Sequence, residues 1–105
     1  MVTGTDKRII DLKNLLRTLQ KDIVLKEVYL FGSCLEKEDY NDIDVALISD
    51  EFSGIRFNDI KFIANKLKKY PSIFDLHPFK TEEFYDHDNY FAEEIIKKGT
   101  KFNWT

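Results

Sequence analysis

The first segment with a clear pattern of apolar positions lies near the start of the chain. Five apolar residues recur there at intervals of three or four: Ile9, Leu12, Leu16, Leu19 and Ile23. This spacing places them along one face of an α-helix. We therefore predict an amphipathic helix from Asp6 to about Asp22 whose apolar face packs against a sheet.

Two runs that follow have the composition of β-strands. Val28 to Phe31 is apolar and rich in strand-forming residues, and it stops at Gly32-Ser33, which predicts a buried strand followed by a turn. The charged stretch from Glu36 to Asn41 is expected to be a loop. A second strand is predicted from about Asp42 to Ser49.

The second of these strands alternates between two kinds of side chain. Ile43, Val45 and Leu47 point to one face, because successive side chains of a strand point to opposite sides. The other face carries Asp42, Asp44, Ala46 and Ile48. Two carboxylates, at positions i and i+2, are therefore predicted to project from the same side.

A second helix and a third strand are predicted after a turn at residues 50–54. The helical stripe precedes Pro71 and consists of Phe57, Ile60, Ile63, Ala64 and Leu67. Ile73 to Phe79 then has the composition of a strand. Alternation places Ile73, Asp75, His77 and Phe79 on one of its faces, and Phe74 and Leu76 on the other.

The last predicted elements are short. A helix is expected from about Asn89 to Lys98, because Asp88 or Asn89 can cap its start and Gly99 ends it. Lys101 to Trp104 is expected to add an edge strand. No repeat or linker divides the predicted elements.

Composition supports one packed domain over residues 1–105. Hydrophobic residues make up 43% of the chain and aromatic residues 14%. A chain of this length buries roughly 65% of its surface on folding, which is enough for an independent core. The net charge is −3, which disfavours the broad basic surface that a long nucleic acid requires.

The expected compartment follows from the same composition. No run reaches the ~20 apolar residues of a membrane-spanning helix, and the start of the chain lacks the basic and apolar segments of a secretion signal. A single cysteine, Cys34, excludes an internal disulfide and is interpreted as a small packed residue. We expect a cytoplasmic protein that makes no membrane contact.

Candidate chemistry begins at Gly32-Ser33 and continues at the carboxylate pair. A glycine turn after a strand lets the backbone approach a ligand, and its N–H groups with the Ser33 hydroxyl can hold phosphate oxygens, although an ordinary turn explains the same residues. Asp42 and Asp44 give a stronger signal, because a divalent cation such as Mg²⁺ would offset their repulsion and leave positions for phosphate oxygens. Simple solvent exposure at the strand entrance is the alternative.

Asp75 interrupts the apolar run of the third strand. In a central strand an uncompensated carboxylate is costly, so a role as a third metal ligand would explain its presence. Exposure on an edge strand is the alternative. His77 lies on the same face and is interpreted either as a nucleotide or acceptor contact or as a partly exposed histidine before Pro78. In the run Asp86-His87-Asp88, Asp88 is interpreted as a helix cap and not as part of a metal site.

Three segments, taken in order, resemble the minimal nucleotidyltransferase family of the polymerase-beta superfamily. They are Leu30-Phe31-Gly32-Ser33, Asn41-Asp42-Ile43-Asp44-Val45 and Phe74-Asp75-Leu76. The resemblance covers most of the chain, through the closing helix that ends at Lys98-Gly99. It implies an α/β (α+β) nucleotidyltransferase fold, in which a small mixed sheet is flanked by helices.

The resemblance also implies roles for the residues at matching positions. Gly32 and Ser33 would hold the β- and γ-phosphates of ATP or another nucleoside triphosphate, with Lys37 as a further nucleotide contact. Three catalytic residues would bind two Mg²⁺ ions: Asp42, Asp44 and Asp75. Asp75 would also help to activate an acceptor hydroxyl. The product would be a nucleoside monophosphate, AMP from ATP, joined to the acceptor.

The size of the chain bears on the acceptor. It is too short for an additional domain that would hold nucleic acid, and minimal members of the family resemble antitoxins paired with a HEPN-domain toxin. We therefore expect transfer to a hydroxyl of a partner protein or another acceptor. A HEPN-domain protein is the expected partner, and a second copy of the chain is the alternative.

Two features depart from the family pattern. Only eight residues separate Ser33 from Asp42, and Cys34 to Lys37 lacks the basic residue and second glycine that usually follow the Gly-Ser pair. Lys37 is a candidate substitute, whereas the glutamates on either side of it add negative charge. The alternatives are therefore a catalytically weak or inactive module that binds a partner, and a small α/β domain whose aspartates are surface groups.

Overall fold

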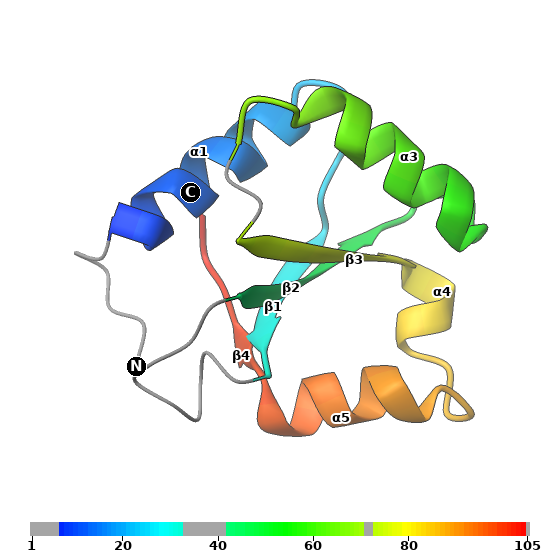
Figure 1. Cartoon of the computed structure of the whole chain (residues 1–105). Helices are drawn as coiled ribbons and strands as arrows, with labels where there is room; N and C mark the ends of the chain where they lie inside the picture. The colour runs from blue at the N-terminus through cyan, green and yellow to red at the C-terminus, as the bar shows by residue number, and fades with distance from the viewer. Residues whose placement is uncertain (1–6, 33–41, 71–72, 105) are drawn as a thin grey trace.

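A four-stranded mixed β-sheet forms the centre of the computed structural model, which describes residues 7–32, 42–70 and 73–104 (Figure 1). The strands are β1 (Glu27–Phe31), β2 (Ile43–Ser49), β3 (Phe74–Lys80) and β4 (Thr100–Lys101). Their order in the sheet is β3-β2-β1-β4. β2 pairs antiparallel with β1 and parallel with β3, and β4 pairs antiparallel with β1. The predicted mixed sheet is confirmed, with β3 and β4 at its edges.

Helices cover both faces of this sheet. They are α1 (Lys7–Leu19), α3 (Arg56–Lys66), α4 (Thr81–Phe84) and α5 (Tyr90–Lys98). α1 and α3 lie over one face, and α4 and α5 lie over the other (Figure 1). The sequence predicts three of these helices to within a few residues and misses the single turn of α4. No helix in the described ranges has the length and apolar character that crossing a bilayer requires.

Of the two predicted caps of α5, Asn89 is confirmed and Asp88 is wrong. The Asn89 side-chain oxygen accepts a hydrogen bond from the backbone N–H of Ala92, 3.1 Å away. This bond satisfies one of the N–H groups that the first turn of a helix leaves unpaired. Gly99 follows the last turn as expected. The cap fixes where α5 starts, and therefore where its first residues lie relative to the sheet.

Alternation along β2 divides the interior into two cores. Ile43, Val45 and Leu47 are fully buried in the larger core, on the face covered by α1 and α3. Ala46 and Ile48 belong to the smaller core, which they form with residues of β3, α4 and α5: Phe79, Phe84, Ala92 and Ile95. Both faces match the predicted alternation. Asp44 shares the face of the smaller core.

α3 buries less of its apolar stripe than the spacing predicts. Ile63 and Leu67 pack in the larger core, but Phe57 is 73% exposed and Ile60 is 39% exposed. The helix contacts β3, which is an edge strand, so the sheet does not extend beneath the outer side of the helix. The uncovered residues leave a surface groove between α3 and β3.

β3 begins one residue later than predicted. Phe74 and Leu76 face the larger core, whereas His77 and Phe79 contact rings of the other face, as expected. Ile73, predicted to share the face of Asp75, packs against the larger core instead. It lies in the turn before the strand, where strict alternation does not apply, and its carbonyl accepts a hydrogen bond from the N–H of Ile43.

The last described residues return to α1. After β4, the backbone N–H of Phe102 donates to the carbonyl of Val28, and Trp104 packs in the larger core. The indole N–H of Trp104 donates to Gln20 Oε1 at 2.7 Å. The edge strand is therefore shorter than predicted, and residues 102–104 contribute mainly to packing.

Candidate active site

Strand register brings Gly32, Asp44 and Asp75 to the same end of the sheet, where β1 stops and β2 and β3 start. Phe31, the last residue of β1, pairs with Asp44 of β2, and Asp44 pairs with Asp75 of β3. Gly32 directly follows β1. Residues from three segments that are far apart in the sequence therefore lie in one row across adjacent strands.

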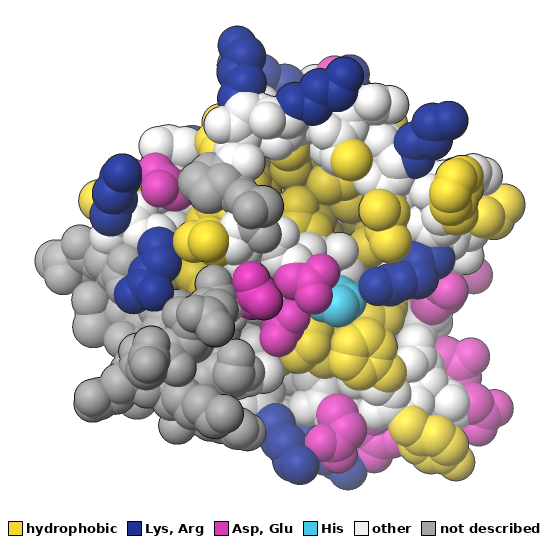
Figure 2. Space-filling model, viewed as in Figure 1, with side chains coloured by type: hydrophobic (Ala, Val, Ile, Leu, Met, Phe, Trp, Pro, Cys, Tyr) yellow, Lys and Arg dark blue, Asp and Glu magenta, His cyan; other side chains and the backbone are white. Residues whose placement is uncertain are grey.

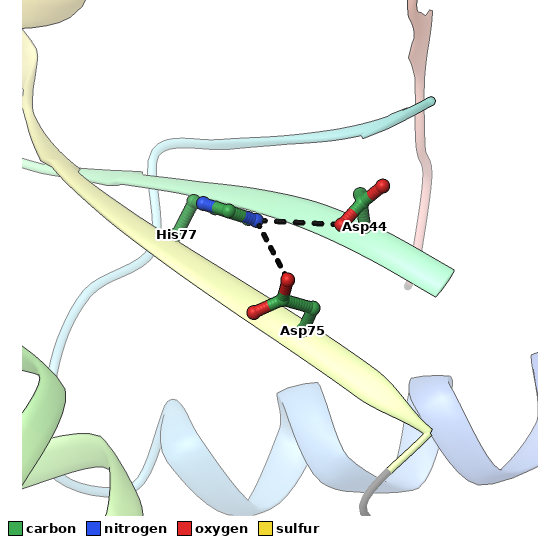
Figure 3. Close-up of side chains that lie close together, drawn as sticks. All are labelled: Asp44, Asp75 and His77. Carbon is green, nitrogen blue, oxygen red and sulfur yellow. Dashed lines mark hydrogen bonds and ion pairs between the residues drawn. The ribbon is translucent and has the colours of Figure 1, made fainter. Parts of the chain in front are cut away.

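Asp44, Asp75 and His77 form a compact group at this end of the strands, called here the carboxylate-histidine group. Each residue offers one ligand atom, and the three atoms lie within 4.8 Å of one another. His77 Nε2 is 3.4 Å from Asp44 Oδ1 and 3.4 Å from Asp75 Oδ2 (Figure 3). The two carboxylate oxygens are hard donors at a separation that fits a divalent cation such as Mg²⁺.

The surroundings of Asp44 disfavour a charged carboxylate. Burial raises the pKa of Asp44 above its ordinary value. The hydrogen bond from His77 acts in the opposite direction, while the charge of Asp75 raises the pKa further. A cation between the two carboxylates would offset both unfavourable effects, so the electrostatics of the group also fit a metal.

Gly32 brings the end of β1 against Asp44. Its φ is +80°, in the left-handed region that glycine enters without steric cost. A Cβ at this position would clash with Asp44 Oδ2. Glycine is therefore favoured for two separate reasons, and the turn exposes backbone next to the carboxylate. The role of this turn in holding phosphate stays a prediction.

Asp42 is the predicted metal ligand that the structure describes outside this group. Asp42 is exposed just before β2, and its carboxylate is not part of the carboxylate-histidine group. Ser33 and Lys37, like Cys34 and the loop predicted at residues 36–41, lie outside the described residues. The roles of Asp42, Ser33 and Lys37 therefore stay predictions.

Asp75 is the residue whose setting differs most from expectation. The hypothesis that its carboxylate lies within a central strand is wrong, because β3 is an edge strand and the Asp75 side chain is 62% exposed. Pro78 in the same strand is a signal for this, since proline lacks the N–H that an inner strand needs. Proximity to Asp44, and not burial, is the argument for Asp75 as a metal ligand.

His77 contacts both carboxylates, a role that the sequence leaves open. Its other ring nitrogen, Nδ1, lies 3.3 Å from Arg56 Nη2. A guanidinium can only donate, so Nδ1 accepts, and the Nε2–H of a neutral ring points toward the carboxylates. Arg56 is the first residue of α3, and because it belongs to no motif, the sequence gives no sign of this contact.

Two apolar surfaces flank the group on the same side of the molecule (Figure 2). One is the groove of about 380 Å³ between α3 and β3, which Arg56 and Asp75 also line. Its apolar walls include Ile60, Ile63, Ala64, Leu67, Tyr70 and Leu76. The other surface consists of aromatic rings next to α5. The carboxylate-histidine group therefore lies between a groove and a set of rings.

Comparisons with known proteins agree with this geometry. A search of curated proteins gave no match. Among solved structures, a protein from Sulfolobus solfataricus, provisionally described as a nucleotidyltransferase, superposes with a TM-score of 0.66. It is 16% identical in sequence, and the match covers 91% of this chain and 79% of that chain. This likeness supports the fold.

The family comparison decides the classification. The family model of the polymerase beta nucleotidyltransferase domain matches residues 13–102. The matched range includes Gly32, Asp44 and Asp75. The match confirms the resemblance to the polymerase-beta superfamily. The chain therefore belongs to the polymerase beta nucleotidyltransferase family.

Proposed function

We propose that this protein transfers a nucleoside monophosphate, AMP from ATP, to an acceptor hydroxyl in a Mg²⁺-dependent reaction. The observation that supports this most directly is the meeting of Asp44 and Asp75, from two strands, beside the Gly32 turn. Nucleotidyl transfer requires negative groups that hold metal ions next to a backbone that phosphate can approach.

The carboxylates are proposed to hold two Mg²⁺ ions. Asp44 and Asp75 are the proposed ligands that lie together, and Asp42, just before β2, would complete the set. When bound, the metal neutralises charge on the departing pyrophosphate and lowers the pKa of the acceptor hydroxyl. Gly32 and Ser33, with Lys37, are proposed to bind the β- and γ-phosphates through backbone N–H groups and side chains.

The proposed reaction breaks a phosphoanhydride bond and forms a phosphoester bond. The acceptor oxygen bonds to the α-phosphorus while the bond from that phosphorus to the β-phosphate oxygen breaks, and pyrophosphate leaves. Asp75 is proposed to accept the proton of the acceptor hydroxyl. Its exposed carboxylate on an edge strand is open to an acceptor that arrives from solvent.

The acceptor is proposed to be a hydroxyl of a partner protein. The chain carries a net charge of −3, which suits a protein acceptor better than a long nucleic acid. A HEPN-domain protein is the proposed partner, with this chain acting as the antitoxin of the pair. A second copy of the chain is the alternative acceptor.

The test is transfer of label from α-³²P-ATP in the presence of Mg²⁺ to the product of the adjacent gene or to the chain itself. Wild-type protein should label an acceptor, and Asp44→Asn and Asp75→Asn should not. Asp50→Asn is the matched control, because Asp50 lies just beyond the far end of β2 and its side chain is 71% exposed. Wild-type protein that binds ATP with Mg²⁺ but labels no acceptor would contradict the enzymatic proposal.

A non-catalytic module that binds a partner is the second candidate. The departure from the family pattern between Cys34 and Lys37 favours it, because the basic residue and second glycine are absent there. Calorimetry separates the two candidates. A module without chemistry would bind no nucleotide with Mg²⁺, and Asp44→Asn would leave partner binding unchanged.

A further inference from the structure

Four aromatic rings lie together beside the carboxylate-histidine group, on the side of α5. The centroid of the Phe91 ring is 5.6 Å from that of Phe31, 5.8 Å from that of His77 and 5.8 Å from that of Phe79. The rings of Phe31 and His77 are 5.1 Å apart. These four residues are called here the aromatic platform.

The platform is continuous with the proposed nucleotide site at two points. Phe31 is followed directly by Gly32, the residue of the proposed phosphate turn. His77 contacts the rings of Phe31 and Phe91, and its Nε2 faces both carboxylates. A ligand that occupies the turn and the carboxylates therefore has aromatic rings next to it.

Phe91 is the member of the platform that is open to solvent. Its side chain is 46% exposed, whereas Phe79 is 6% exposed and the His77 side chain 13%. Contacts with three rings hold Phe91 in place, so binding a ligand there costs little further ordering. An aromatic ring that is fixed and exposed is a surface on which a nucleobase stacks, because every base has a π-face.

We infer that Phe91 binds the nucleobase of the substrate by stacking, and that the site prefers purine to pyrimidine nucleotides. Two fused rings offer more area for stacking than one. The inference rests on the proposed function, because it assigns base recognition to the same nucleotide site.

The groove between α3 and β3 is the competing location for the base. Its walls are mostly aliphatic, and it reaches the carboxylate-histidine group through Asp75. Asp75 is on the edge strand β3, and β2 separates that strand from β1 and Gly32. The aromatic platform instead adjoins Gly32 through Phe31, so both ring chemistry and continuity with the phosphate turn favour it.

The test measures nucleotide binding without turnover. The α,β-methylene analogues of ATP, GTP, CTP and UTP are titrated with Mg²⁺ into wild-type protein, Phe91→Leu and Phe91→Trp by calorimetry. Leucine keeps apolar bulk but has no π-surface, so the Kd for the purine analogues should rise about 5- to 100-fold. Tryptophan should restore tight binding, and the wild-type protein should bind both purine analogues more tightly than the pyrimidine ones.

A spectroscopic readout and two further variants complete the test. In NMR spectra, the base protons of the bound ATP analogue should shift upfield in wild-type protein and lose this shift in Phe91→Leu. Phe57→Leu is the matched control, because Phe57 is 73% exposed on α3, on the opposite face of the sheet. Ile60→Ser probes the groove. Thermal unfolding verifies that each variant is folded.

The outcomes separate this inference from the proposed function. Equal Kd values and unchanged base-proton shifts in wild-type protein and Phe91→Leu would overturn the stacking role of Phe91 and leave the proposed function standing. A loss of binding confined to Ile60→Ser would overturn it in favour of the groove. If wild-type protein binds no triphosphate analogue with Mg²⁺, the proposed function itself fails, and this inference fails with it.

Discussion

The two faces of the sheet differ in the side chains that β2 places on them. On the face covered by α1 and α3, β2 carries three apolar side chains that are fully buried: Ile43, Val45 and Leu47. On the other face, β2 begins with the partly exposed Asp44 before it reaches Ala46 and Ile48. Packing in the larger core therefore fixes the backbone of β2, and the other face accommodates a charged side chain where this strand begins.

This difference couples the site to the core through the pleat of β2. Asp44 lies between Ile43 and Val45 in the sequence, and burial of these two neighbours on the larger-core side turns Asp44 to the opposite side. A register shift of one residue would exchange the two sets. The position of the proposed metal ligand is thus set by apolar packing on the face that it does not share.

The largest expected effect comes from removing charge on the smaller-core face. Asp44→Asn keeps the size of the side chain but removes a carboxylate ligand, so the transfer rate should fall roughly a thousandfold, the consequence of losing ~4 kcal/mol of transition-state stabilisation. The melting temperature should not fall. Initial rates with labelled ATP, and calorimetry of unfolding, measure the two quantities. A variant that retains full transfer would remove Asp44 from the proposed mechanism.

The next largest effect tests whether the larger core is the less adaptable one. Leu16→Ala, which deletes a fully buried side chain of the larger core, should lower the free energy of unfolding by about 2–5 kcal/mol. Ile95→Ala in the smaller core should cost less, because a core beside an open edge relaxes more easily around a cavity. Urea unfolding of both variants measures the difference. A larger loss in Ile95→Ala would reverse the comparison.

A smaller effect is expected at the turn between β1 and the site. Gly32 and Gly54 both have positive φ, +80° and +85°, so alanine should cost about 1–2 kcal/mol at either position. Gly54→Ala meets only ordinary contacts, the nearest atom lying 3.6 Å away, whereas Gly32→Ala also displaces the Asp44 carboxylate. Gly32→Ala should therefore lower the melting temperature and weaken Mg²⁺ binding more than Gly54→Ala does. Equal changes in melting temperature and in Mg²⁺ affinity for the two variants would show that the Asp44 carboxylate does not lie against Gly32.

The smallest expected effect is a dependence of stability on pH. Because burial raises the pKa of Asp44 in the folded state, this residue contributes stability that is fully present below its unfolded pKa and is lost as the pH rises through the folded pKa. Asp44→Asn lacks this contribution, so the stability of wild-type protein relative to the variant should fall as the pH rises from about 3 to 7. Urea unfolding across this range measures it, with Asp50→Asn as the control. A difference that stays constant with pH would contradict the raised pKa.

Much of the scaffold could be predicted because alternation and helical spacing are local. The two faces of β2, the cap of α5 at Asn89 and the stop at Gly99 all follow from neighbouring residues. The carboxylates could be singled out for the same reason. α4 could not, because four residues are too few for an apolar period.

What could not be predicted depends on strand order. That Asp44 pairs with Asp75, and that β3 is an edge strand, are properties of the sheet and not of either segment alone. The exposure of Asp75 therefore contradicts an argument based on its own strand, although Pro78 carried a signal for the edge. The contact between Arg56 and His77 joins residues of different elements and has no counterpart in the local pattern.

Trp104 gives the molecule a built-in optical reporter of one face. It is the only tryptophan of the chain, it is packed in the larger core, and its indole N–H is bound to Gln20. Its fluorescence should therefore follow packing of the larger core and move to longer wavelength on unfolding. A change in this emission when nucleotide binds beside Gly32 would mean that binding on one face of the sheet alters the packing of the larger core on the other face.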